Sequence, residues 1–190
     1  ESVTIDSGAT LTIQSGVTIS LEYIDVDTNN IGDISIKVLG VLNIKGSINS
    51  PVVFKPLRNT NKNTHWQGIS FLNSSRPSKI NYLELYNVHT GLSIHSEIKV
   101  KGLTINRPEK HGVFINSVAD NVIDLRNVNI VHSKKVGFFL EKGNVSVNWC
   151  TISKCDGSGL VVNKEGVMNL KNFKIIQNKD NGLSNYGTLT

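Results

Sequence analysis

The chain has 190 residues, the size of one ordinary domain, and a net charge of +5. Val, Ile and Thr supply 20, 20 and 12 of these residues, whereas Ala occurs twice and Met once. This excess of β-branched side chains predicts an all-β protein and excludes helical bundles, coiled coils and Rossmann-type domains. No apolar run approaches the ~20 residues that a membrane span needs, so we expect no span in this chain.

The charge is distributed unevenly along the chain. Residues 1–33 contain six acidic side chains and no Lys or Arg, so the remaining residues contain 20 basic and 9 acidic side chains. Asp25, Asp27 and Asp33 lie in this acidic stretch among Asn and Gly residues, and oxygen ligands at alternate positions suit Ca²⁺. We treat the three aspartates as a candidate Ca²⁺ site. A solvated loop is the alternative, because no Glu follows at the twelfth position of the stretch.

A glycine followed by two apolar residues that flank one other residue recurs along the chain. Successive copies are separated by 23, 21, 25, 22 and 23 residues. The six glycines are Gly68, Gly91, Gly112, Gly137, Gly159 and Gly182. Each copy also contains two short alternating strands that meet at a Gly or Asn, residues that tolerate a left-handed bend.

One repeat of about 23 residues is too small to bury its own apolar face. Repeats must therefore stack, each strand pairing in parallel with its equivalents in the neighbouring repeats. The period predicts a parallel β-helix, a solenoid of about eight coils.

The repeat over residues 68–187 resembles that of the right-handed parallel β-helix superfamily, the pectin-lyase-like fold. The segments 8–19, 36–46 and 66–69 resemble the opening coils of large secreted or surface-anchored β-helix proteins, including animal junction proteins of the bark beetle (anakonda) type. This resemblance implies an extracellular or cell-surface location and a mostly non-catalytic role.

We expect one β-helix domain over residues 1–190, with opening coils in 1–66 and regular coils in 67–190. The first residue is not Met, and Thr188–Thr190 look like the start of another strand. We therefore expect the chain to be a fragment of a larger protein.

Enzymes of this fold that cleave acidic polysaccharides need several acids or a Ca²⁺ cage beside a Lys or Arg on one outer face. The aligned outward columns of the repeat contain no two neighbouring acids. We therefore expect no catalytic residues and no cofactor, and interpret His111 and His132 as solvated surface residues. A polysaccharide lyase or glycoside hydrolase acting on an acidic polysaccharide is the alternative function.

Two outward columns are candidate binding surfaces. Lys101, Arg126 and Lys171 align in a basic column that suits an acidic glycan. The alternative is that these charges only keep the edge soluble and block aggregation. A second column, otherwise made of Ser, places three apolar side chains outside on consecutive coils, which indicates an interface. These residues are Phe114, Phe139 and Val161. The alternative is that the 116–121 loop of the same chain covers this apolar patch.

The two cysteines do not form a disulfide framework or a zinc pattern. Cys150 aligns with inward residues of the repeat, which disfavours a bond to Cys155 in the following turn.

The sequence thus predicts a rigid, non-catalytic surface or adhesion module with a protein or glycan partner at a cell surface, or with self-association. No aromatic residues interleave with the basic ones, so nucleic acid is not expected as a partner.

Overall fold

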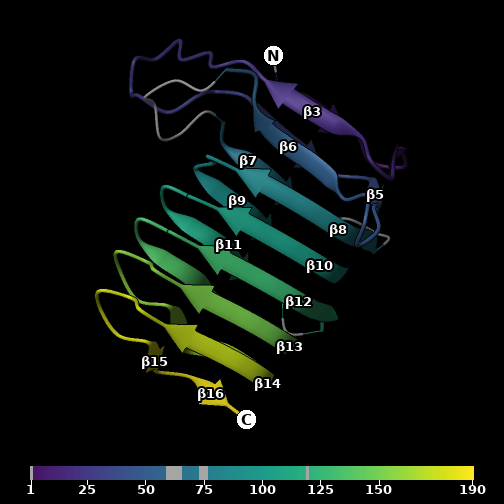
Figure 1. Ribbon diagram of the computed structural model, residues 1–190. Coiled ribbons are helices and arrows are strands. Elements are labelled where there is room, and N and C mark those ends of the chain that lie inside the picture. Colours follow the sequence, from purple (N-terminus) through teal and green to yellow (C-terminus); the bar gives the residue numbers. More distant parts are fainter. Residues whose placement is uncertain (1, 59–65, 73–76, 119) are drawn as a thin grey trace.

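The computed structural model describes residues 2–58, 66–72, 77–118 and 120–190. These residues form 16 strands and no α-helix, and the strands pair in parallel as the chain winds into a solenoid (Figure 1). The described residues contain no helix long and apolar enough to cross a membrane. The all-β prediction and the parallel β-helix are therefore confirmed.

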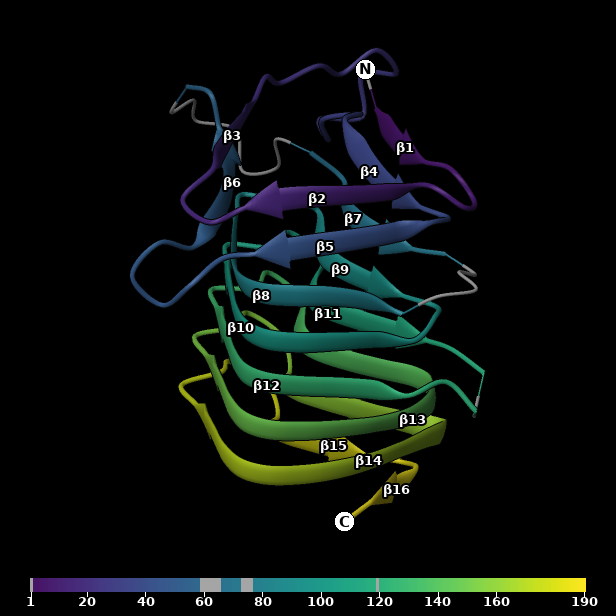
Figure 2. The same ribbon diagram turned by 90° about the vertical axis from the view of Figure 1, so that its right-hand side faces the viewer.

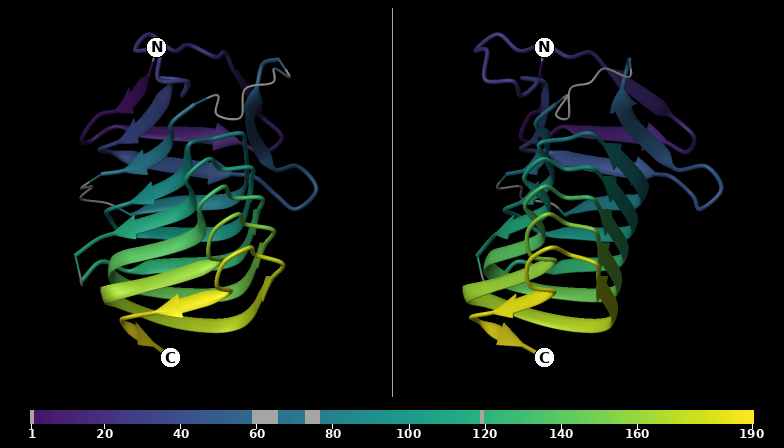
Figure 3. Two further views of the ribbon diagram at one scale, coloured as in Figure 1. Left: turned by 90° about the vertical axis from the view of Figure 1, so that its left-hand side faces the viewer. Right: turned by 60° about the vertical axis from the view of Figure 1, so that its left-hand side comes forward.

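Three parallel sheets form the sides of the solenoid, as Figure 2 and Figure 3 show. The first sheet contains β1 (Val3–Ile5), β4 (Ser35–Val38), β7 (Gly68–Phe71), β9 (Thr90–Ile94), β11 (His111–Asn116), the first parts of β13 (Val136–Ser153) and β14 (Leu160–Ile176), and β15 (Leu183–Asn185). The second contains β2 (Thr10–Gln14), β5 (Val41–Lys45), the first parts of β8 (Ser78–Tyr86), β10 (Ile98–Asn106) and β12 (Ile123–Val131), the middle parts of β13 and β14, and β16 (Thr188–Leu189). The third contains β3 (Thr18–Leu21), β6 (Val52–Pro56) and the ends of β8, β10, β12, β13 and β14.

The solenoid has about five regular turns, whereas the repeat length predicted about eight coils. The regular turns are β7–β8, β9–β10, β11–β12, β13 and β14. Before them, β1 to β6 are separate strands of 3 to 5 residues, and residues 22–34 form a long connection between β3 and β4. After the regular turns, β15 and β16 pair with only parts of β14. The predicted number of coils came from dividing the length of the whole chain by the length of the repeat. It therefore included these irregular parts as full coils.

A single residue turns each regular coil from the second sheet to the third. It has a positive φ in all five regular turns: Tyr82 (46°), Gly102 (80°), Asn127 (55°), Trp149 (62°) and Asn172 (52°). The prediction of Gly or Asn at this bend is confirmed at three of these positions. Tyr82 and Trp149 are exceptions, because bulky side chains rarely adopt this backbone conformation.

The core fills the space between the three sheets. Side chains alternate along the strands, so that Phe138 is 1% exposed and the next residue, Phe139, is only partly buried. Both cysteines are free and buried, and burial raises the pKa of Cys150 to about 12 and that of Cys155 to about 11. These thiols are therefore core groups with little nucleophilic character at neutral pH.

Phe173 aligns with the buried residues Val128 and Cys150 but is 52% exposed. The described strands that follow β14 pair with it at residues 160–162 and 167–168, and neither of them pairs with it at Phe173.

Candidate functional site

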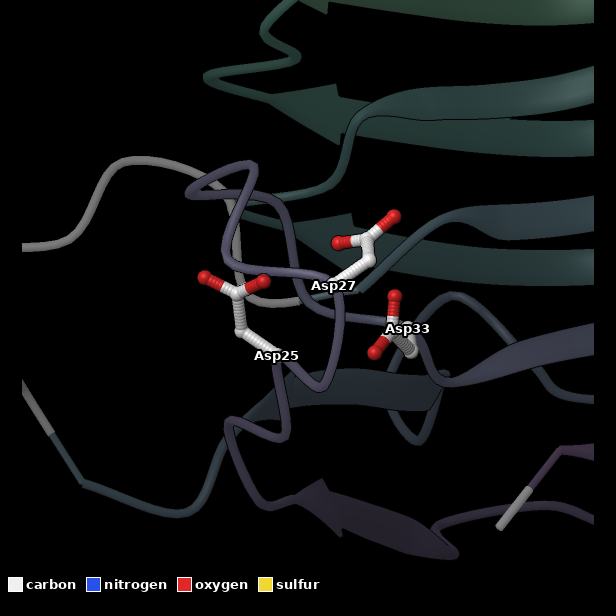
Figure 4. A group of neighbouring side chains, drawn as sticks. All are labelled: Asp25, Asp27 and Asp33. Atoms are coloured by element: carbon white, nitrogen blue, oxygen red, sulfur yellow. The ribbon is translucent and has the colours of Figure 1, made fainter.

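The acidic loop joins β3 to β4 and brings together the three aspartates that the sequence singled out. Oxygen atoms of Asp25, Asp27 and Asp33 all lie within 4.8 Å of one another (Figure 4). Their number and spacing suit a hard cation, since Ca²⁺ prefers oxygen ligands.

The same carboxylates also close the loop on itself. Asp25 accepts hydrogen bonds from the backbone N–H groups of Asn29 (3.1 Å) and Asn30 (3.0 Å), and Asp33 accepts one from Val26 (2.6 Å). A hydrogen bond from the Tyr23 hydroxyl lowers the pKa of Asp25. The loop therefore satisfies these acids internally, and the Ca²⁺ site stays a prediction from the sequence.

The second sheet presents four exposed lysines on neighbouring strands, which we call the basic face: Lys45, Lys79, Lys99 and Lys101. The strand register places Lys79 directly beside Lys99, and Asn81 between Lys45 and Lys101. Adjacent strands are ~4.8 Å apart and alternate residues of one strand ~6.8 Å apart, so four positive charges share a small area.

The four lysines have no acidic partner among the described residues. Four basic side chains elsewhere in that part of the chain form ion pairs, among them Lys142 with Glu165 (2.8 Å) and Lys179 with Asp156 (2.7 Å). Asp124 is the register neighbour of Lys99 but forms its ion pair with Arg126, so the basic face keeps a net positive potential toward solvent.

Only one residue of the predicted basic column belongs to the basic face. Lys101 and Arg126 are neighbours in the register, and Asn148 separates Arg126 from Lys171. Arg126 forms an ion pair with Asp124 (2.9 Å), so part of its positive charge is already balanced within the chain. Sequence reasoning missed Lys45, because the irregular spacing of the opening coils hides its alignment with Asn81.

A hollow of about 550 Å³ lies against the basic face. Lys45 and Lys79 line it together with Thr10, Asn43 and Asn81. Ammonium groups, amides and a hydroxyl around one hollow can bind an anionic, hydroxyl-rich molecule through several hydrogen bonds.

The apolar column lies on the outer surface of the first sheet, where Phe114 pairs with Phe139 and Phe139 with Val161. All three side chains are half-buried. The imidazole of His111 stacks on Phe114 (5.9 Å between centroids) and contacts Phe139 (5.3 Å), and His95 meets the edge of Phe114 (6.1 Å). Imidazoles therefore contact both aromatic rings of the patch, and its role as an interface stays a prediction.

His111 is only 9% exposed, so its interpretation as a solvated residue is wrong. The two phenylalanine rings bury it. Burial, followed by the positive charge of Lys110, lowers its pKa from 6.5 to about 4. Burial and Lys110 also lower the pKa of His89.

The free energy of unfolding should therefore fall in mild acid. Between pH 6.5 and 4 the unfolded chain protonates His111 while the folded chain resists protonation, so stability is complete above pH 6.5 and falls by about 3 kcal/mol as the pH approaches 4. Urea unfolding at pH 7, 5.5 and 4 measures this fall. His111→Thr, which introduces the residue of the equivalent position Thr90, should show a smaller fall. An equal fall in both proteins would assign the effect to other groups.

A second hollow, of about 570 Å³, lies at the bend between the second and third sheets. Trp149, Asn127 and Asn172 of the bend column line it, with Asn129 and Lys174 beside them. Trp149 is 60% exposed. The sequence repeat did not mark this residue, because it occupies a position where Gly and Asn were expected.

Comparison with known proteins identifies the repeat. The family model described as "Right handed beta helix region" matches residues 41–190, more than three quarters of the chain. Searches of the curated proteins and of the solved structures found no match.

Proposed function

We propose, from the premise that the chain belongs to the right-handed β-helix family, that it is a rigid, non-catalytic binding module of a secreted or cell-surface protein, and that its partner is an acidic glycan. The fold does not fix this function. The observation that carries it is the basic face, four exposed lysines without an acidic partner among the described residues.

The geometry of the basic face suits a polymer with repeated negative charges. Its lysines lie on three adjacent strands of a hydrogen-bonded sheet, β5, β8 and β10, so their backbone is already fixed before a ligand arrives. Such preorganisation lowers the entropic cost of binding. Asn81 lies between Lys45 and Lys101, and Asn43 lies beside Lys79. Both amides offer donors and acceptors for hydroxyl groups.

A protein partner at the apolar patch has weaker support. The patch is half-buried, and the imidazoles of His95 and His111 already contact its rings. The extracellular location is supported by the resemblance of the opening coils to secreted β-helix proteins.

Binding of heparin and polygalacturonate, measured by calorimetry at several salt concentrations, tests the proposal. The variant Lys45→Gln, Lys79→Gln, Lys99→Gln, Lys101→Gln should bind about 30-fold more weakly, because each exposed charge pair contributes about 0.5 kcal/mol. Binding of the unchanged protein should weaken as salt rises.

A matched control removes the same charge from elsewhere. Lys55, Lys135, Lys154 and Lys164 are exposed and lie outside the second sheet, so their replacement by Gln should weaken binding much less. Equal losses in both variants would show that net charge alone is recognised and would contradict the proposed site. Release of unsaturated ends or reducing sugar from the polymer would contradict the non-catalytic role.

A further inference from the structure

Two aromatic residues occupy the strained bend position, and they differ in what their neighbours allow. Tyr82 has Gly102 as the next residue of the bend column, and a Cβ at Gly102 would lie only 2.6 Å from Cδ1 of the tyrosine. The ring of Tyr82 therefore packs against Gly102, where a side chain would leave no room for it, and is half-buried. Its packing on the chain accounts for its presence at this position.

Trp149 has no glycine beside it in the bend column. Its neighbours in the bend column are Asn127 and Asn172, and Asn172 donates a hydrogen bond to Asn148 (2.9 Å). The indole consequently remains 60% exposed. A bulky residue with φ of 62° is a conformational outlier, and the folded chain gains little packing from this one.

We infer that Trp149 is the stacking platform of a sugar-binding subsite, on which one pyranose ring of the acidic glycan lies. The inference rests on the proposed function and extends it to a second contact. The apolar face of a pyranose matches the indole face, and amide groups of Asn127 and Asn172 in the same hollow suit its hydroxyls. Lys174, at the edge of the hollow, suits a carboxylate or sulfate.

The position of the subsite agrees with a ligand that also covers the basic face. Trp149 directly follows Asn148, which is in the same outward column as Lys101 and Arg126. Two coils separate Lys101 from Asn148, a distance of about 10 Å at the usual strand spacing. One linear oligosaccharide of a few units that runs along the solenoid axis can therefore contact both surfaces.

Tryptophan fluorescence tests the subsite directly, because the chain has two tryptophans and Trp66 is fully buried. Acrylamide quenching should report mainly on Trp149. Addition of oligogalacturonates should protect this indole and shift its emission to shorter wavelength. Trp149→Asn, which introduces the residue of the neighbouring bends, should weaken binding about tenfold.

Tyr82→Asn is the matched control, since it removes the other aromatic bend residue outside the hollow and should leave affinity unchanged. Unchanged affinity in Trp149→Asn, or no protection by bound ligand, would overturn the subsite, while a loss of binding in the lysine variant would keep the proposed function. If acidic ligands do not bind, the proposed function fails. Cello-oligosaccharides then decide the subsite: protection of Trp149 would support it, and no protection would overturn it.

Discussion

Replacement of Gly137 by alanine should lower the free energy of unfolding by about 3 kcal/mol, the cost of forcing an atom into a closely packed region. A Cβ at Gly137 would lie 2.7 Å from the backbone oxygen of Gly159 in the next coil and 2.4 Å from Cγ2 of Ile152. The backbone oxygen cannot move without opening the parallel pairing of two coils. Urea unfolding followed by circular dichroism measures the loss.

Gly182→Ala is the matched control in the same column of the repeat. There the nearest atom to an added Cβ is Cγ2 of Ile175 at 3.7 Å, an ordinary contact. Neither Gly137 nor Gly182 has a positive φ, so backbone strain does not enter the comparison. We expect the stability of the control to be unchanged or slightly higher, because alanine restricts the unfolded chain. Equal destabilisation by both substitutions would contradict stacking of glycines as the reason for the repeat.

The glycine column explains why the fold could be predicted from the sequence. Each repeat glycine from Gly91 to Gly159 lies against the oxygen of the next one, so the spacing of glycines in the chain records the spacing of coils in space. The inward and outward positions then follow from strand alternation, which is why Cys150 was correctly placed in the core.

The surfaces were predicted less well, because they depend on two columns lying side by side. His111 looked solvated when compared only with its equivalents Thr90 and Val136. Its burial comes from Phe114 and Phe139 in a neighbouring column. A single aligned column contains no information on such lateral contacts.

The bend hollow could not be predicted for a different reason. The repeat indicated Gly or Asn at the bend, and Trp149 contradicts the conformational preference on which that prediction rested. Sequence reasoning identifies positions that obey local preferences. A residue that violates these preferences can be recognised as unusual only when its backbone angle and its exposure are known.

The other tryptophan should have the largest effect on stability. Trp66 is fully buried, stacks on Phe54 with 5.6 Å between ring centroids, and donates its indole N–H to the backbone oxygen of Tyr86 (3.2 Å). It therefore joins the opening strand β6 to the end of β8, the first long strand of the regular turns. Trp66→Ala leaves a large cavity at this junction and should cost about 4 kcal/mol.

Trp66→Phe separates the two contributions of this side chain. A phenyl ring retains much of the stacking on Phe54 but cannot donate to Tyr86, so we expect a loss of about 1–2 kcal/mol. Trp149→Asn, at the exposed tryptophan, should not lower stability, since it relieves the strain of a bulky residue at positive φ. Unfolding followed by circular dichroism compares the three variants without reliance on fluorescence. Similar losses in Trp66→Ala and Trp149→Asn would show that both indoles are part of the core.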